Sequence, residues 1–539
     1  MWSSVVILSL LFFASGIQKL PVIDRDEAHF AQASRQMLQS GNFFQIRFQD
    51  RTRFQKPPGI NWLQAGSVKL FSGADSNHIW PYRIPSLLGA LFAVLATLYL
   101  GTRLLTERIG FIASLFLASS LLLVAEAHMG VIDAALLASV VLMQAALWIV
   151  YQASANKVRV NYLWPLCFWL AMAAGLVLKG VTPLVGLLSI TALCIIDRDL
   201  RWLRNLWPFT GLALLLSLSL IWVILVNEAE HSNYLMQMIH KDLLPKLKGG
   251  HESHGKPPLF HLAILPLTFW PASLFLWPAG VYAFRHRKET AVKFLLAWII
   301  PTWAFFELMP TKLPQYILPV FPALALLSAM AVESLLNGEF LRGSRWLKFL
   351  QGMWGVLSLG FAVFILVISY VLLNRPSWSA TFLLSAVFIL TAITLFFVFR
   401  YSYYRAVAAL MVMATVVYCL SFNQILPRLD PLWITPKIAA LASEYSLSAE
   451  NPLVAVGFDE PSLVFNLNTD WVRFADSNEA LAFMQRNAQQ LVLIDDKTFA
   501  GWQIPYDRFA VIARVHGFNY SKGRWLNLFL VGPKNNESN

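Results

Sequence analysis

Residues that could act in catalysis or binding gather in one long polar stretch near the N-terminus. Residues 23–62 run IDRDEAHFAQASRQMLQSGNFFQIRFQDRTRFQKPPGINW and separate two apolar segments. The stretch contains two adjacent carboxylates, Asp26 and Glu27, followed by His29 and Lys56. Carboxylates can act as general bases, whereas lysines and histidines can bind an anion or an anionic leaving group. A polar connection this long is seldom a simple linker, so we predict the active-site loop of a membrane-embedded enzyme.

Further polar groups stand where later apolar segments end. They are Glu126, His128, Asp133, Lys179, His240, Lys241, His251, Glu252, His254, Lys256, Lys312 and Tyr316. Ionisable groups that share one side of a membrane indicate a cavity on that side. Asp133 is the most informative of them, because a carboxylate at the start of an apolar helix is costly without a partner or a task.

Each of these residues also has a simpler explanation. Asp26 and Glu27 could cap a helix and favour its dipole. Lys179 and Lys312 could be membrane-surface lysines whose stems lie along apolar neighbours while their charges reach water. The choice between these explanations depends on whether the side chains converge in space.

One cluster before residue 259 resembles a metal site, namely His251, Glu252 and His254. Histidines in loops more often serve other purposes, so we predict neither a metal nor another cofactor. The three cysteines of the chain lie in apolar runs, which indicates small buried hydrophobes rather than disulfides or metal ligands.

The elements that must position these residues are membrane helices. The chain of 539 residues is 57% hydrophobic and 13% charged, with a mean hydropathy of +0.57, beyond the composition of ordinary soluble domains. Apolar runs occupy residues 4–20, 84–103, 110–126, 132–151, 162–178, 181–196, 207–226, 259–284, 293–309, 313–335, 347–373, 378–399 and 405–426. Because each is near the length that crosses a bilayer, we predict an all-α polytopic membrane protein with about 13 transmembrane helices.

Basic residues in alternate connections predict the orientation. They are Arg103, Arg108, Lys157, Arg159, Arg198, Arg201, Arg204, Arg285, Arg287, Lys288, Arg342, Arg345, Lys348, Arg400 and Arg405. The positive-inside rule places them, and the N-terminus, in the cytoplasm. We therefore expect a multi-pass protein of the inner (plasma) membrane whose C-terminus is periplasmic. The net charge of +12 then indicates membrane topology and no nucleic-acid partner.

Two domains are expected. Residues 1–426 form the transmembrane domain, with residues 21–83 as its extracytoplasmic catalytic loop. Residues 427–539 change in composition and predict a small extracytoplasmic α/β domain. Its expected strands are PLVAVGF, SLVFNL, QLVLIDD, FAVIARV and RWLNLFLVG, and its expected helices are residues 436–447 and 477–489.

Local signals also divide the catalytic loop. Residues 27–38 predict a short helix that Asp26 could cap and that Gly41 could follow. After the break at Pro57 and Pro58, residues 60–71 are apolar enough for a helix that lies on the membrane surface.

Six sequence blocks resemble a known family. In order they are DRDEAHFAQASRQML, FQKPPGINWL, EAHMGVIDAALL, GLVLKGVTPLV, ESHGKPPLFHL with FWPASLF, and TKLPQYILPVFPALALL. They resemble the membrane glycosyltransferases related to protein O-mannosyltransferases, a group that includes bacterial aminoarabinose transferases of lipid A. The blocks fall within residues 24–330, and their common order makes the resemblance specific.

The resemblance implies a GT-C fold and a polyprenyl-phosphate sugar donor. It implies that Asp26 of the Asp26–Glu27 pair is the key carboxylate, that Lys56 and Tyr316 touch the donor phosphate, and that Asp133 is the second-loop carboxylate. Two departures from the aminoarabinose transferases leave the sugar and the acceptor open. The block before the prolines is Arg-Phe-Gln-Lys rather than Tyr-Phe-Glu-Lys, and His29 stands where that subgroup usually has arginine.

The residues themselves are compatible with this chemistry. A lipid-phosphate sugar is already activated, and the chain has no nucleotide-binding G-x-x-x-x-G-K-[ST] motif. An acceptor oxygen would attack the anomeric carbon, and Asp26 would accept its proton if the acceptor is a hydroxyl. Lys56, helped by Lys256 or Lys312, would stabilise the departing phosphate. The expected partners are the lipid-linked donor, a lipid (lipid A or lipopolysaccharide type), glycan or protein acceptor, and membrane lipids.

Two other functions stay open from the sequence. A transporter or flippase of a lipid-linked sugar would use the outer carboxylates as binding sites, but it would carry charges at mid-span and inverted repeats. A hydrolase would use the same carboxylates with water as the acceptor.

Overall fold

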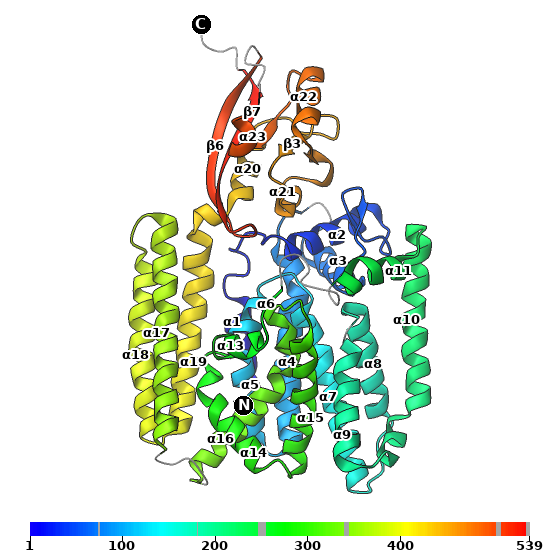
Figure 1. Ribbon diagram of the computed structural model, residues 1–539, viewed down its shortest axis with the longest axis vertical. Coiled ribbons are helices and arrows are strands. Elements are labelled where there is room, and N and C mark those ends of the chain that lie inside the picture. The colour runs from blue at the N-terminus through cyan, green and yellow to red at the C-terminus, as the bar shows by residue number, and fades with distance from the viewer. Residues whose placement is uncertain (74–75, 181, 246–254, 339–343, 503–507, 535–539) are drawn as a thin grey trace.

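The structure, a computed structural model, describes residues 1–73, 76–180, 182–245, 255–338, 344–502 and 508–534. A helical bundle forms its larger part, and a smaller mixed α/β unit stands on one end of the bundle (Figure 1). The helices of the bundle are α1 (Trp2–Ala14), α4 (Trp80–Leu104), α5 (Glu107–Ala118), α6 (Leu121–Ala127), α7 (Asp133–Ala155), α8 (Leu163–Leu178), α9 (Thr182–Asp197), α10 (Pro208–Glu230), α13 (Phe260–Thr268), α14 (Leu276–Arg285), α15 (Thr290–Leu308), α16 (Phe321–Leu336), α17 (Arg345–Leu373), α18 (Trp378–Phe399) and α19 (Tyr403–Leu420).

All thirteen predicted apolar runs are helical, but they differ in length. In the described part of the chain, eight helices are long and apolar enough to cross a membrane, or ten if two bent pairs each count as one span. Three shorter apolar helices, α1, α8 and α9, account for the other runs. The bent pairs correct the expectation of straight helices at residues 110–126 and 259–284. α5 and α6 meet at 63°, and α13 meets the segment Ala272–Arg285, which comprises η4 (Ala272–Phe275) and α14, at 115°.

The central helices pack tightly, and the outer ones present apolar side chains outward. α4 packs against α5 and α7, and α16 packs against α5. α10, α17 and α18 are mostly uncovered within the molecule, with large exposed side chains such as Leu216, Phe364 and Phe382. Apolar surface of this extent is stable next to lipid chains, so these helices form the lipid-facing perimeter.

The polar loop between α1 and α4 lies across one end of the bundle as two helices, α2 (Asp26–Ser40) and α3 (Gly59–Phe71) (Figure 1). A short hairpin joins them, made of β1 (Arg47–Phe48) and β2 (Arg51–Thr52). Gly41 follows α2 in the left-handed conformation, as predicted. Asp26 is not the cap, however. It is the first residue of α2, and Arg25 precedes the helix without a side-chain cap bond.

Gly59 allows the loop to approach the bundle closely. A Cβ atom at Gly59 would lie 2.6 Å from the carbonyl oxygen of Val177, near the end of α8. No real side chain fits at that distance, so glycine is required for this approach. The segment that follows Lys56 is therefore packed against the helix end that leads to Lys179.

The C-terminal unit is built on a five-stranded sheet in the order β4-β3-β5-β7-β6. Its elements are α20 (Ile434–Ala442), β3 (Leu453–Val456), α21 (Pro461–Asn466), β4 (Val472–Phe474), α22 (Ser477–Arg486), β5 (Val492–Asp495), α23 (Asp496–Phe499), β6 (Phe509–Asn519) and β7 (Arg524–Pro533). β3 pairs in parallel with β4 and β5, and β7 pairs antiparallel with β5 and β6. Four predicted strands and both predicted helices are confirmed.

One predicted strand is wrong. The run SLVFNL forms the helix α21, which begins at Pro461. Leu463 and Val464 are buried in the core of the C-terminal unit, whereas Phe465 packs with Tyr82 of the bundle. Burial on both sides produces an uninterrupted apolar run, and such a short run does not distinguish a helix from a strand.

Candidate functional site

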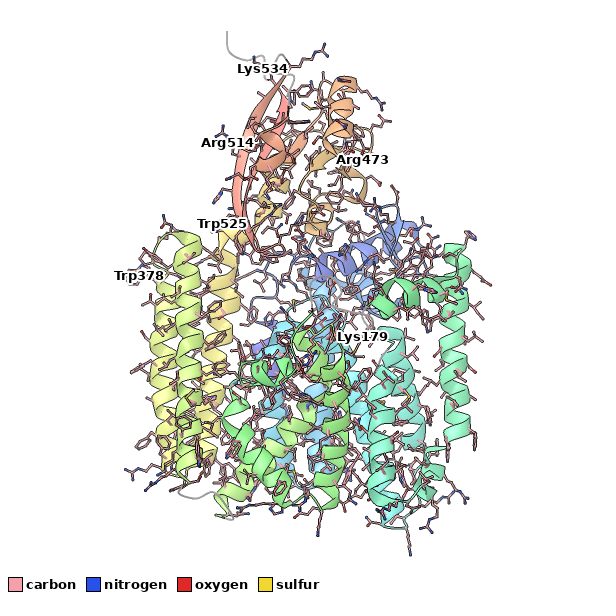
Figure 2. The ribbon with its side chains drawn as sticks, in the orientation of Figure 1. Lys179, Trp378, Arg473, Arg514, Trp525 and Lys534 are labelled. Atoms are coloured by element: carbon pink, nitrogen blue, oxygen red, sulfur yellow. The ribbon has the colours of Figure 1, made fainter. Side chains whose placement is uncertain are left out.

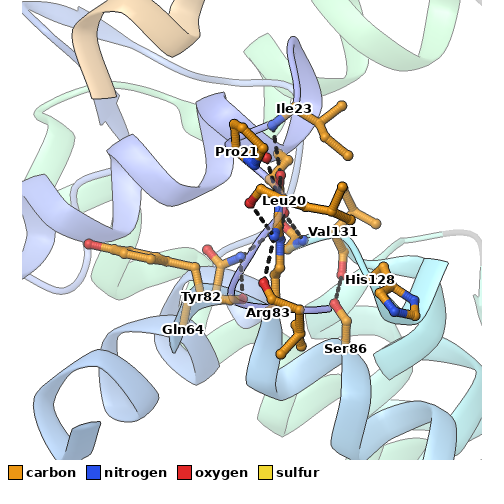
Figure 3. A network of polar contacts seen from close by, with 12 residues as sticks. Leu20, Pro21, Ile23, Gln64, Tyr82, Arg83, Ser86, His128 and Val131 are labelled. Atoms are coloured by element: carbon orange, nitrogen blue, oxygen red, sulfur yellow. Dashed lines mark hydrogen bonds and ion pairs between the residues drawn. The ribbon is translucent and has the colours of Figure 1, made fainter. Parts of the chain in front are cut away.

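The carboxylate of Glu27 is the buried anchor of the polar loop between α1 and α4, and its partner Arg83 lies in the polar network of Figure 3. Arg83, at the start of α4, donates to both of its oxygens at 2.8 Å, and the backbone N–H groups of Gly130 and Ile23 donate at 2.6 and 2.8 Å. The exposed fractions are 1% for the Glu27 side chain and 0% for Arg83. Arg83 also donates to the carbonyls of Ile17, Leu20 and Pro21. Both oxygens of Glu27 are thus committed to holding α2 on the bundle.

Asp26 points away from this anchor and is exposed. Adjacent helical residues differ by about 100° in direction, so one of the pair is buried and the other faces outward. Its carboxylate makes no hydrogen bond or ion pair with the other residues that the structure describes. Asp26 is therefore available to an incoming group, which Glu27 is not.

Glu126 connects the loop to the rest of the site electrostatically. It lies on α6, is 4% exposed, and its Oε2 is buried without a hydrogen-bond partner in the described part of the chain. Its charged neighbours are Asp133, Lys179 and Asp26. A buried carboxylate without donors is costly, so Glu126 is a candidate member of the site.

His29 is a neutral group in this environment. Its ring packs edge-on against Phe48 at 4.8 Å between centroids. Burial and the neighbouring Arg53 guanidinium lower the pKa of His29 to about 3. At neutral pH, His29 can take part in hydrogen bonding but cannot serve as a positive charge for an anion.

Asp133, Lys179 and Tyr316 come together around a hollow. Lys179 Nζ lies 2.7 Å from Asp133 Oδ1 and 5.1 Å from the centre of the Tyr316 ring. Figure 2 shows Lys179 at the end of the bundle that faces α2. The hollow is small and partly open to solvent, and its remaining lining is Leu136, Val140, Thr182, Val185, Phe306, Gln315 and Pro319. Among the described residues, the hollow therefore has charged side chains only at Asp133 and Lys179, and most of its remaining lining is apolar.

Lys56 does not line this hollow and pairs with a different carboxylate. Its Nζ lies 3.1 Å from Asp242 Oδ2 in η2 (Ile239–Leu243), and both side chains are partly exposed. The Tyr234 hydroxyl lies 2.7 Å from the carbonyl oxygens of both Arg53 and Lys56 and donates its one proton between them, which fixes the backbone beside Lys56. A partly hydrated pair of this kind opens at little cost, so Lys56 can exchange Asp242 for another anion.

The remaining predicted residues lie elsewhere or outside the described chain. Lys312 is 4% exposed, and its ammonium donates to the carbonyls of Met309 at 2.8 Å and Lys256 at 3.3 Å. Lys312 thus links the segment at Met309 to the segment at Lys256. Lys256 itself is exposed. His254 lies outside the described residues.

A metal centre is not formed by the described residues, among which no group of three or more His, Cys, Asp or Glu side chains could hold an ion. The cluster that resembled one, His251 with Glu252 and His254, lies outside them. The cysteines are free and only half-buried.

Sequence reasoning missed Arg83 and Asp242 as partners of predicted residues. Arg83 carried a usable signal, because an arginine inside the apolar run WPYRIPSLLGALF requires a buried partner. Asp242 carried none, since its pairing with Lys56 spans 186 residues.

Comparison with known proteins gives consistent matches. A family model described as dolichyl-phosphate-mannose-protein mannosyltransferase matches residues 55–224. An undecaprenyl phosphate-alpha-4-amino-4-deoxy-L-arabinose arabinosyl transferase of Pseudomonas aeruginosa is 29% identical over 383 residues, which are 70% of this chain and 66% of the relative. A Pseudomonas fluorescens relative of the same description is 30% identical over 359 residues, or 65% of this chain and 62% of the relative. The match thus spans just under two thirds of the relatives' length.

Solved structures share the fold over nearly the whole chain. ArnT from Cupriavidus metallidurans, bound to undecaprenyl phosphate, superposes with a TM-score of 0.75 at 18% identity, covering 98% of this chain and 97% of that one. An oligosaccharyltransferase from Archaeoglobus fulgidus gives a TM-score of 0.54 at 11% identity, with 92% and 69% covered.

The fold therefore defines the class, a polytopic membrane protein of the GT-C type with a C-terminal mixed-sheet domain. Within that class, the chain is related to the protein O-mannosyltransferases and, more specifically, to the bacterial aminoarabinose transferases. The resemblance found in the sequence blocks is confirmed.

Proposed function

We propose that this protein is a membrane glycosyltransferase that moves a sugar from a polyprenyl-phosphate donor to a lipid acceptor of the lipid A type. The observation that carries the proposal is the hollow lined by Asp133, Lys179 and Tyr316. A cation, Lys179, stands at one place on its rim, and Leu136, Val140 and Val185 supply apolar walls. A phosphate on an apolar chain has the matching chemistry.

The reaction requires one bond to form and one to break. An acceptor hydroxyl oxygen would form a bond to the anomeric carbon as the bond from that carbon to the phosphate oxygen breaks. Asp26 would accept the hydroxyl proton, and the electron pair would leave with the polyprenyl phosphate. Lys56 and Lys179 would stabilise the growing phosphate charge once their carboxylate partners are displaced.

Glu27 is proposed as a positioning residue rather than a catalytic one. Its two oxygens are held by Arg83 and two backbone N–H groups. A carboxylate in that state has no free oxygen for a substrate proton. The lysines and Tyr316 stay candidates for donor binding.

A transfer assay tests the proposal. Purified protein would be incubated with undecaprenyl phosphate carrying 4-amino-4-deoxy-L-arabinose, or carrying other sugars, with and without lipid A. Sugar on lipid A is the expected result. Free sugar without acceptor would indicate a hydrolase, and donor that changes leaflet without cleavage would indicate a flippase.

The proposed role of Lys56 in binding the donor phosphate gives a first prediction. We expect Lys56→Ala to weaken binding of undecaprenyl phosphate and to lower the single-turnover rate further, since phosphate charge grows as the sugar leaves. Lys56→Arg should recover part of both, because the charge remains while its shape and reach change. The matched control is Asp242→Asn, which removes the partner of Lys56 and should leave donor binding intact. Equal losses in Lys56→Ala and Asp242→Asn would assign Lys56 to loop structure alone.

Orientation gives a second prediction. We propose that the C-terminal unit is periplasmic, on the same side as Lys179, as the basic connections predict. Lys534 lies at the outer tip of that unit (Figure 2), and Arg201 lies in η1 (Arg201–Leu206), a connection rich in arginine. In intact spheroplasts, Lys534→Cys should react with an impermeant thiol reagent above the background of the native cysteines. Arg201→Cys should react only after lysis, and the reverse pattern would contradict the proposed orientation.

A further inference from the structure

The residues immediately before α2 are held by the C-terminal domain. The Asp24 carboxylate accepts two hydrogen bonds from Ser462, one from the backbone N–H at 2.8 Å and one from the hydroxyl at 2.7 Å. The backbone N–H of Asp24 donates to the Tyr520 hydroxyl oxygen at 2.8 Å. Arg25 lies 3.9 Å from the buried Glu460 carboxylate. Both residues that precede Asp26 are therefore fixed from the C-terminal side.

The same domain also contacts α2 closer to its C-terminal end. Arg35 donates to the carbonyl of Phe465 at 2.9 Å, with its guanidinium over the Phe465 ring. Gln32 donates to the Thr469 hydroxyl at 2.7 Å. Figure 1 shows α21 directly above α2. The helix is thus clamped between the C-terminal domain on one side and the Glu27–Arg83 anchor on the other.

The contact is specific rather than incidental, because it takes a carboxylate partly out of water and supplies two donors to it. Burial, together with the neighbouring Glu460 carboxylate, raises the pKa of Asp24 to about 7. Two donors from one residue offset part of that cost. The Ser462 hydroxyl is itself within 2.9 Å of the Thr435 hydroxyl, so its orientation is set within the domain.

We propose that Ser462 and Tyr520 of the C-terminal domain are positioning residues that fix where the Asp26 carboxylate stands relative to the acceptor. This inference rests on the proposed role of Asp26 as proton acceptor. Neither residue needs to touch a substrate, because each acts on the backbone or side chain of Asp24, two residues before Asp26. A misplacement at the reacting centre of even about 1 Å lowers rates severely.

The test is a double-mutant cycle on the full-length protein. Tyr520→Phe removes the acceptor of the Asp24 N–H group, and Ser462→Ala removes one of the two donors to its carboxylate. Each should lower single-turnover transfer from undecaprenyl phosphate 4-amino-4-deoxy-L-arabinose to lipid A roughly 3- to 10-fold, the range for one lost hydrogen bond. Binding of undecaprenyl phosphate should stay within about twofold of wild type, since its proposed lysines lie elsewhere.

The decisive measurement is the single-turnover transfer rate of the Tyr520→Phe, Asp26→Asn double variant compared with that of Asp26→Asn alone. If Tyr520 acts through Asp26, the second change should cause no further loss. Amide hydrogen exchange of residues 22–30 should also be faster in Tyr520→Phe, while that of α4 is unchanged. The control is Arg473→Ala, an exposed residue of the same domain paired with Glu479, which should leave rate and exchange unchanged.

The outcomes separate the two proposals. A full additional loss in the Asp26→Asn background, a parallel fall in donor binding, or unchanged exchange at residues 22–30 would overturn the positioning role. Wild-type transfer to a hydroxyl acceptor by Asp26→Asn alone would overturn the proposed role of Asp26, and the positioning inference with it.

Discussion

Asp26→Asn should lower the rate of sugar transfer at least about 100-fold, the lower range for loss of a general base. The variant keeps the size of the side chain and removes its basicity. Because Asp26 is exposed and its carboxylate is bonded to no other described residue, the fold should tolerate the change. The measurement is single-turnover transfer to a hydroxyl acceptor, with thermal unfolding in detergent as the check on folding.

A second carboxylate of the same loop provides the control for Asp26. Asp50 is also exposed, and Asp50→Asn should transfer sugar at the wild-type rate. Wild-type transfer by Asp26→Asn to a hydroxyl acceptor would reduce Asp26 to a charge that favours the start of α2. A phosphate acceptor is already ionised, so a mild loss restricted to phosphate acceptors would identify the acceptor chemistry.

Glu27→Gln should act on stability rather than on the chemical step. It keeps the volume of the side chain but leaves the Arg83 guanidinium, 0% exposed, without its counter-ion. Breaking a buried ion pair by removing one partner costs about 3–5 kcal/mol. We expect a correspondingly lower unfolding midpoint in detergent and less folded protein in the membrane.

An exposed ion pair gives the matched comparison for Glu27. Arg201 and Asp199 pair at 3.0 Å on the surface, and Arg201→Ala should leave the unfolding midpoint close to that of wild type, because a fully hydrated ion pair contributes little to stability. If Glu27→Gln unfolded like wild type and yet lost transfer, Glu27 would be catalytic after all, as the loop sequence first suggested.

The division of roles between Asp26 and Glu27 illustrates what tertiary structure adds. The sequence makes the pair conspicuous, since two adjacent carboxylates in a loop between apolar segments are unusual. It does not say which of them is buried, because that depends on the rotation of α2 against α4. The rotation is set by Arg83, 56 residues further along the chain.

Local pattern predicted most of the architecture. Thirteen apolar runs of bilayer length required helices, because an unpaired backbone is too costly in lipid. The change of composition after residue 426 predicted the α/β unit, and short runs rich in β-branched and aromatic residues predicted four of its strands. The exceptions, the bends after α5 and α13 and the helix α21, occur where packing from two sides decides the conformation and the local apolar pattern is the same either way.

The sequence alone determined the class of protein, the membrane helices and the set of polar residues at their ends, because length, polarity and motif order are properties of the chain itself. Only the tertiary structure decided how these residues are paired. It joined Lys179 to Asp133 and Lys56 to Asp242, made His29 neutral, and placed Ser462 and Tyr520 over the start of α2. The physical reason is that charge pairing and burial depend on distances between segments up to 496 residues apart, which no local pattern encodes.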